Sequence, residues 1–215
     1  LDGTLAYIAA NGEMTIGGLP IAPPAAPDGT RLVPEAPAWS PLGGWLAYIL
    51  RTPGAEAGAE GDFSQDGLWL RGTDGRNIHL AASDYSRAGH RIFTGPLSWR
   101  PDGTEVLAGV STPDGFAVAR VIIASGEVRP VWDSSDLPPG TYAGAQWSHD
   151  GAAIIADAEE RILRIQPETL STQVLLAEDA NLHPHRARQH ADGRLTFAAR
   201  PVGDNSAAWR LYLTA

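Results

Sequence analysis

Residues 39–50 read WSPLGGWLAYIL, and the phrase returns as WRPDGTEVLAGV at residues 99–110 and as WSHDGAAIIADA at residues 147–158. The Asp-Gly step inside it is typical of a tight turn, because glycine accepts the positive φ that other residues resist. One strand must end before this turn and another must begin after it. Each copy of the phrase therefore predicts two adjacent antiparallel strands.

The turn recurs along the whole chain with a period of roughly 40 to 60 residues, which is typical of repeat architectures. After it, the central units carry a second pair of apolar strands with a turn of its own, so each unit reads as four antiparallel strands. Such a unit cannot bury both apolar faces alone and must stack on neighbours. We therefore predict an all-β β-propeller with about five blade units. The turn occupies residues 2–3, 42–43, 102–103, 150–151 and 192–193.

We expect one propeller domain over residues 1–215, in which the first unit lacks its first strand and the last unit lacks its fourth. Either the two ends close on each other around the ring, or further blades are missing. The turns at residues 42–43 and 189–193 should be less regular, because Leu42 replaces Asp and Gln-His-Ala replaces Trp-Ser-Pro. The predicted blade units are residues 1–35, 36–82, 95–133, 143–178 and 183–215.

These phrases resemble the TolB-like β-propellers, whose repeats carry W-S-P-D-G followed by an LAY-type strand. The chain shows this pattern in WSPLGG, WRPDGT, WSHDGA and QHADGR, and LAYI follows at residues 46–49. The resemblance covers nearly the whole chain and is specific for the fold rather than for an activity. It implies a bacterial, extracytoplasmic scaffold that binds a protein or peptide partner without catalysing a reaction.

Composition excludes several classes of function. The 16 basic residues, all arginine, face 25 acidic ones for a net charge of −9, which argues against nucleic acid as a partner. The chain has no cysteine, so thiolate nucleophiles and cysteine-bound metals are absent. No apolar run is long enough to span a membrane. Because the chain opens on Leu1 rather than Met, we expect a processed or trimmed piece of a longer protein.

A binding site should lie on the face that carries the long connections, near the central channel, because binding residues concentrate in loops held by a rigid scaffold. The long connections are residues 51–66, 81–96, 133–144 and 178–188, whereas the turns of the opposite face are short. The predicted partner-binding residues are Asp84, Tyr85, Arg87, His90, Arg91, Asp133, Asp136 and Tyr142.

A histidine cluster at residues 183–190 is the weak candidate for a metal site. His183 and His185 are two residues apart, so both imidazoles could point the same way in an extended segment, with His190 as a third ligand. Propeller lyases that act on pectic oligosaccharides offer a precedent. Pro184 bends the segment and no carboxylate is obvious nearby, so we favour no metal and expect no cofactor.

The tryptophans divide into two sets. Trp39, Trp99 and Trp147 recur in register and should fill the gaps between blades, because residues placed identically in every blade serve packing. A ligand-stacking ring would instead come from the irregular set. The acidic stretches at residues 54–66 and 156–160 should be solvated, mobile loops. The irregular set is Trp45, Trp69, Trp132 and Trp209.

Two classes of function remain after these exclusions. The first is the non-catalytic binding module. The second is the propeller part of an enzyme, either a metal-dependent polysaccharide lyase or the gating domain of a serine peptidase whose catalytic domain lies elsewhere. The chain has no G-x-S-x-G and no H-E-x-x-H motif, so we favour the binding module.

Overall fold

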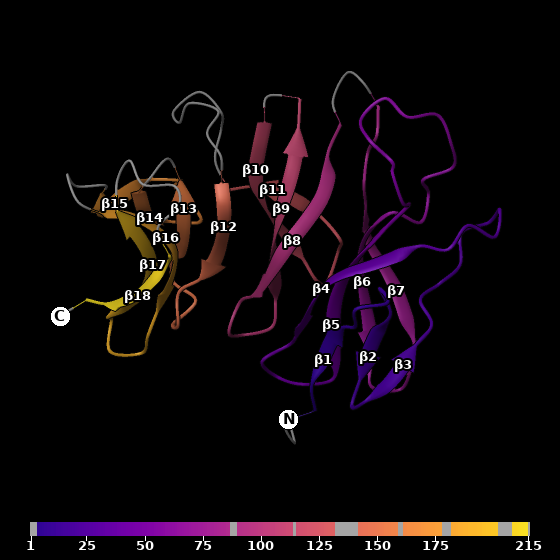
Figure 1. Ribbon diagram of the computed structural model, residues 1–215, viewed down its shortest axis with the longest axis horizontal. Coiled ribbons are helices and arrows are strands. Elements are labelled where there is room, and N and C mark those ends of the chain that lie inside the picture. Colours follow the sequence, from indigo (N-terminus) through magenta and orange to yellow (C-terminus); the bar gives the residue numbers. More distant parts are fainter. Residues whose placement is uncertain are drawn as a thin grey trace.

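The computed structural model describes residues 4–86, 90–113, 115–131, 142–158, 161–177, 182–201 and 208–214. Its strands form five antiparallel sheets (Figure 1), which confirms the all-β propeller fold. The first sheet has β1 (Ala6–Ile8), β2 (Met14–Ile16) and β3 (Leu19–Ile21). The second has β4 (Val33–Trp39), β5 (Trp45–Arg51), β6 (Gly67–Gly72) and β7 (Asn77–Ala82). The third has β8 (Ile92–Trp99), β9 (Glu105–Thr112), β10 (Gly115–Ile122) and β11 (Val128–Pro130).

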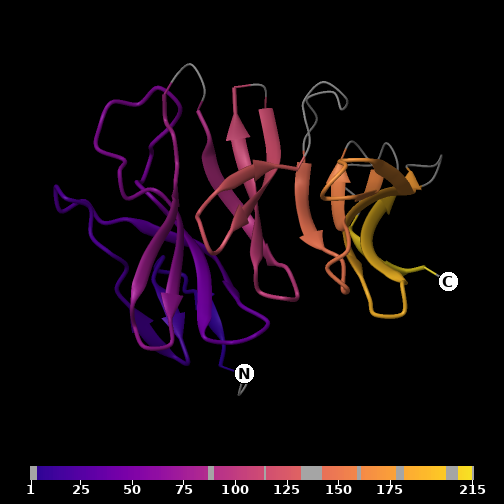
Figure 2. The ribbon, with the colours of Figure 1, turned by 180° about the vertical axis from the view of Figure 1, so that it is seen from behind.

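The fourth sheet has β12 (Tyr142–Trp147), β13 (Ile154–Ala158), β14 (Arg161–Ile165) and β15 (Thr172–Ala177). The fifth has β16 (Leu182–Gln189), β17 (Leu195–Pro201) and β18 (Arg210–Leu213). The first and last sheets thus have three strands and the others four, as the repeat analysis predicts. Consecutive sheets contact one another. The fifth sheet lies at the left of Figure 1, and the first lies at the lower right, where it overlaps the second; Figure 2 shows the same arrangement from behind.

The turns between the first two strands of each repeat share one hydrogen-bond pattern. Gly43 N–H donates to Ser40 O at 3.0 Å, and Gly103 N–H donates to Arg100 O at 2.9 Å. The prediction of an irregular turn at Leu42 is therefore wrong: Leu42 is 72% exposed, and Gly43 supplies the required φ of 73°. The QHADGR turn keeps the shared bond, from Gly193 N–H to His190 O at 3.0 Å. It differs in the bond that closes the turn, which His190 N–H donates to Arg194 O, four residues on, whereas Ser40 N–H donates to Trp45 O, five residues on.

The apolar core lies between the sheets rather than within any one of them. Trp99 packs among residues of the second and third sheets, and Trp147 packs among residues of the third and fourth. Trp39 packs against the cluster between the first and second sheets. The prediction that these recurring tryptophans fill the gaps between blades is confirmed.

Long and short connections lie on opposite faces (Figure 1). The segment 52–66 emerges at the top of the view, whereas the turns at residues 40–44, 100–104 and 148–153 lie at the bottom. We call the top the long-loop face and the bottom the short-turn face.

The acidic stretch 54–66 is a loop, as predicted, in which Glu56, Glu60 and Asp62 are exposed but two other residues are buried. The loop prediction is wrong for residues 156–158, and residues 159–160 lie outside the described residues. In residues 54–66, Ala55 is 5% exposed and the Asp66 side chain is fully buried. In residues 156–158, which lie in β13, Asp157 is 4% exposed. The apolar run after the turn predicts a strand here, and pairing of β13 with β12 and β14 buries the carboxylate with it.

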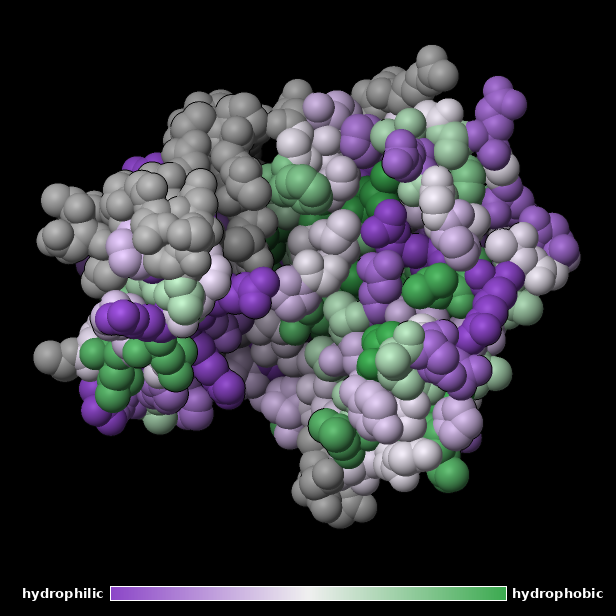
Figure 3. All heavy atoms as spheres, in the orientation of Figure 1, coloured by the Kyte–Doolittle hydropathy of each residue, from purple (hydrophilic) through white to green (hydrophobic). Residues whose placement is uncertain are grey.

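Apolar side chains reach the surface over the fifth sheet, at the lower left of Figure 3. Among them Leu211 and Leu213 are 77% and 54% exposed, and Trp209 is 47% exposed. Leu211 and Leu213 pair with Ala198 and Thr196, and Tyr212 between them points the other way, toward Phe197 and the core. Within the described ranges, the chain contains no helix that is long and apolar enough to cross a membrane.

Candidate binding groove and loop face

The first strands of the second to fifth sheets, β4, β8, β12 and β16, lie innermost and contact one another. Each carries a break in its pairing register: between Glu35 and Ala38, between Thr94 and Ser98, between Tyr142 and Gly144, and between His185 and Arg188. Ala36 and Arg186 each take a φ of 51°, in the left-handed region that non-glycine residues seldom occupy. Breaks of this kind re-aim side chains on a sheet, and each of these four inner strands has one. Two further breaks lie in the β6–β7 and β14–β15 pairings.

The inner strands approach each other at these breaks, and β4 and β8 do so closely enough to exclude a side chain at Gly95. A Cβ on Gly95 would lie 2.4 Å from the Cβ of Ala36, and a Cβ on Gly144 would lie 3.5 Å from Pro96. Gly95 thus permits the close approach of β8 to β4.

A hollow of about 470 Å³ opens on the inner side where the third, fourth and fifth sheets meet. Pro96, Gly144 and Arg186 from the register breaks line it, together with the buried Asp157. Arg186 N–H donates to Asp157 Oδ2 at 2.9 Å, which fixes the left-handed turn of β16. The remaining lining residues are Leu97, Ser98, Ala145, Gln146, Ile155 and Ala187.

A second hollow of about 410 Å³ adjoins the first toward the short-turn face and shares Leu97, Ser98 and Gln146 with it. Its walls include the recurring Trp39, Trp99 and Trp147 and, from β16, Arg188. We call the two adjoining hollows the inner groove. Hydrogen bonds between neighbouring sheets brace it: Trp99 Nε1 donates to Ala38 O at 2.8 Å, Trp147 N–H donates to Ser98 Oγ at 3.1 Å, and Gln146 Nε2 donates to Ala187 O.

On the long-loop face, a buried carboxylate anchors two long connections to each other. Asp66 Oδ2 accepts hydrogen bonds from Thr52 N–H and from the Tyr85 hydroxyl, both at 2.7 Å, and its Oδ1 accepts one from Thr52 Oγ1 at 2.8 Å. Phe63 packs on the Tyr85 ring with centroids 4.4 Å apart. Burial, together with the hydrogen bond and charge of Asp66, raises the pKa of Tyr85 far above its ordinary value. Tyr85, predicted as a contact residue, is therefore 6% exposed and holds the loop from below.

The structure brings three of the predicted contact residues together beside this anchor. Asp84 and Arg91 form a β-bridge, with Asp84 N–H donating to Arg91 O at 2.9 Å and Arg91 N–H returning a bond of 2.8 Å. Both side chains are exposed, and His90 between them is half-buried. Hydrogen bonds from Ser86, and then the charges of Arg91 and His90, lower the pKa of Asp84.

The other predicted contact residues are only partly covered by the structure. Arg87, Asp133 and Asp136 lie outside the described residues. The Tyr142 backbone begins β12 and pairs with Ala158.

The histidine candidates for a metal lie in and beside β16. The backbones of His183 and His185 pair with Arg200 and Ala198, and their side chains lie outside the described part of the chain. The exposed His190 ring forms a hydrogen bond with Thr196 Oγ1. In the part of the chain that the structure describes, no three His, Asp or Glu residues form a group that could hold a metal ion.

The irregular tryptophans are divided in their exposure. Trp69 is 6% exposed and stacks on His79 with centroids 4.5 Å apart. Trp45 lies under Arg76, and the exposed Trp209 lies under Arg200. Trp132 falls outside the described residues.

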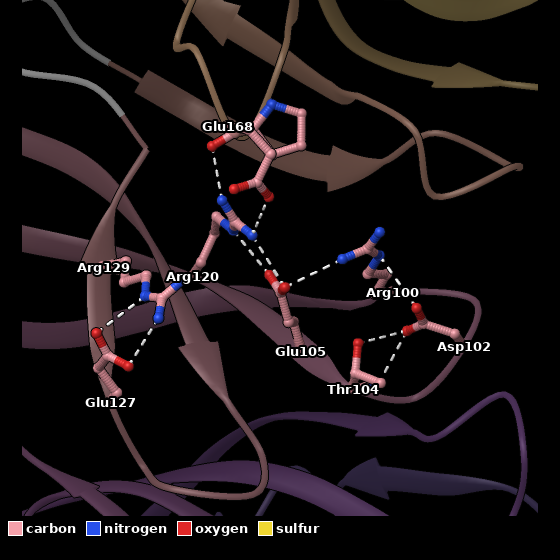
Figure 4. Close-up of polar contacts among 9 residues, drawn as sticks. Arg100, Asp102, Thr104, Glu105, Arg120, Glu127, Arg129 and Glu168 are labelled. Atoms are coloured by element: carbon pink, nitrogen blue, oxygen red, sulfur yellow. Dashed lines mark hydrogen bonds and ion pairs between the residues drawn. The ribbon is translucent and has the colours of Figure 1, made fainter.

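A buried ion-pair network joins the third sheet to the fourth (Figure 4). Arg120 donates from Nε and Nη2 to the two oxygens of Glu105, at 2.7 and 2.9 Å. It also donates to Pro167 O at 2.6 Å and to Glu168 Oε1 at 2.9 Å across the sheet boundary. Arg100 adds a second pairing to Glu105 at 3.1 Å. Arg120 is 4% exposed and makes four hydrogen bonds within the protein, so the network stabilises the junction between sheets rather than forming a site.

Sequence reasoning missed the groove residues Ser98, Gln146, Arg186 and Arg188. Ser98, Gln146 and Arg188 directly precede Trp99, Trp147 and Gln189, the residues at the position of the repeated tryptophan. A position that varies beside one that repeats is the signal that could have found them. Arg186 carried no such signal, because the register break that exposes it is a tertiary feature.

No protein-family model matches this sequence, and no curated protein matches it. Among solved structures, TolB from Acinetobacter baumannii superposes with a TM-score of 0.65 at 18% identity, covering 98% of this chain and 49% of that one. An oligogalacturonate lyase in complex with manganese gives 0.60 at 10% identity, covering 83% and 49%. Dipeptidyl peptidase 4 from Porphyromonas gingivalis gives 0.58 at 9% identity, covering 98% and 35%.

The chain therefore has a TolB-like propeller fold. It spans about half the length of the TolB and lyase chains, and 35% of the peptidase chain. At such identities the likeness concerns the fold alone.

Proposed function

We propose that this chain is a non-catalytic binding module that holds a protein or peptide partner in the inner groove and on the long-loop face beside it. The observation that carries the proposal is the hollow of about 470 Å³ between the inner strands of three sheets. It combines apolar walls with a few polar groups on a rigid frame, which is the usual composition of a ligand site.

The loop residues extend this surface. Asp84 and Arg91 offer exposed charges of opposite sign beside half-buried His90, on a loop that Asp66 and Tyr85 hold from below. Arg87, Asp133, Asp136 and Tyr142 belong to the proposed contact surface by their place in the long connections. An extracytoplasmic location is part of the same proposal, from the TolB-like sequence phrases.

Selection from a displayed random-peptide library on the immobilised chain tests the proposal. We expect an enriched sequence family whose free peptide competes for binding, and whose affinity falls several-fold in Arg91→Ala but not in Arg129→Ala. Arg129 is the matched control because it is an exposed arginine on β11, an outer strand. Failure to enrich any sequence over a blank surface would refute the binding role.

A further inference from the structure

We infer that the inner groove selects acidic, extended peptide segments, and that Arg186 and Arg188 of β16 are the residues that select them. The inference rests on the proposed function and names the partner's chemistry. Arg186 lines the upper hollow and Arg188 the adjoining one, so the two guanidinium groups serve one continuous groove.

Among the described residues, neither arginine side chain has a committed partner. They are exposed, and neither forms an ion pair with any residue that the structure describes. Arg186 donates its backbone N–H to Asp157, and its guanidinium forms no hydrogen bond with the described residues. Other arginines behave differently in this acidic chain: Arg120, Arg129 and Arg194, for example, are paired with carboxylates.

The groove contains few other charges. Asp157 is 4% exposed, and one of its oxygens already accepts the Arg186 N–H. The other polar groups of the groove include Ser98, Gln146 and Gln189, and His149 lies at the lower rim. A guanidinium binds a carboxylate through two parallel hydrogen bonds, so carboxylates are the complementary groups for this surface.

The geometry points to an extended segment. Arg186 and Arg188 flank Ala187 at the register break of β16, so their Cα atoms are at most about 7 Å apart. Alternate residues of an extended peptide span about the same distance. Carboxylates at positions i and i+2 would therefore reach both arginines. The peptide residue between the two carboxylates would point away from the arginines, toward the apolar surface that Trp39 and Trp99 supply. Nucleic acids are bound by many basic residues, and this groove offers two guanidinium groups in a chain with a net charge of −9. A phosphate chain is therefore the poorer match.

Two fluorescein-labelled pentapeptides test the inference by anisotropy: Ser-Glu-Val-Glu-Ser and its uncharged twin Ser-Gln-Val-Gln-Ser. We expect the acidic peptide to bind about tenfold or more tightly than the twin at about 0.05 M NaCl, and to lose most of this preference at about 0.5 M. Arg186→Gln and Arg188→Gln should each weaken the acidic peptide several-fold and leave the twin unchanged. Arg129→Gln on the outer strand is the matched control and should change neither.

Circular dichroism and the melting temperature test whether the variants are folded. We expect that they are, because glutamine keeps the backbone N–H that binds Asp157. Equal binding of the twins, no binding of either, or an undiminished acidic preference in the double variant would overturn the inference. Enrichment of neutral or basic sequences in the library selection would overturn it too while leaving the proposed function standing. A failed library selection refutes the binding role itself, so the two failures are distinguishable.

Discussion

Arg120 and Glu105 form a bidentate ion pair on adjacent strands β10 and β9, with both side chains at least nine-tenths buried. They are diagonal neighbours on one face, because Arg120 pairs with Leu107 and Glu105 with Ile122. From there Arg120 reaches Pro167 and Glu168 of the fourth sheet. The pair is thus the polar counterpart of the apolar packing between the sheets.

Removing Arg120 should destabilise the chain strongly. In Arg120→Met the Glu105 carboxylate stays buried with only Arg100 beside it, and we expect the free energy of unfolding to fall by about 3 kcal/mol. Urea unfolding followed by tryptophan fluorescence measures this. Arg129→Met, which breaks an exposed pair with Glu127, should change stability by less than about 1 kcal/mol. Losses of equal size in the two variants would contradict the account, and Arg120→Met combined with Glu105→Met should recover part of the loss.

The same pair predicts how stability depends on pH. Burial alone would raise the pKa of Glu105, but the hydrogen bonds and charges of Arg120 and Arg100 outweigh it and lower that pKa below its ordinary 4.5. A lowered pKa in the folded state means that the stabilisation is complete above about pH 5 and is lost as the pH falls through the folded-state pKa. The stability difference between the wild type and Glu105→Gln should therefore shrink as the pH falls from 6 toward 3. A difference independent of pH would count against the ionised pair.

The buried carboxylate of the long-loop face should control the order of that face. Asp66→Ala leaves the Tyr85 hydroxyl and two donors of Thr52 without their acceptor, at a cost of roughly 3 kcal/mol. Tyr85→Phe removes one bond and should cost about 1 to 2 kcal/mol. Limited proteolysis should cut residues 52–66 faster in both variants. Glu60→Gln, an exposed change in the same loop, is the control, and equal cleavage in all variants would contradict the anchor.

The close approach of the inner strands predicts a clash that a second change relieves. In Gly95→Ala the new Cβ meets the Cβ of Ala36 at 2.4 Å, which should force β4 and β8 apart and cost about 1 to 3 kcal/mol. Adding Ala36→Gly should restore stability, because glycine also suits the φ of 51° at that position. Gly72→Ala is the control, since its nearest neighbour is the movable carboxylate of Asp74. No rescue by Ala36→Gly would show that the strands do not meet there.

The fold could be predicted from the sequence because each copy of the repeated tryptophan phrase contains the glycine of the turn and the apolar residues of the strand that follows it. Leu42 shows how little the turn depends on the aspartate, since Gly43 alone supplies the unusual φ. For the candidate site, the sequence predicted on which face of the propeller it lies, but not the residues of the inner groove. Tyr85 resembles a contact residue in the sequence, and only the tertiary fold shows that its hydroxyl lies on Asp66. Arg186 enters the groove through a register break that no local pattern records.

Hydrogen exchange of the chain, free and with a peptide from the library selection, tests the central claim most directly. Binding in the inner groove should slow the exchange of amides in β8, β12 and β16 and in the long connections, because a ligand suppresses local opening where it binds. Exchange in the outer strands β7, β11 and β15 should be unchanged. Slowed exchange confined to the outer strands, with the inner strands unaffected, would contradict a binding site in the groove.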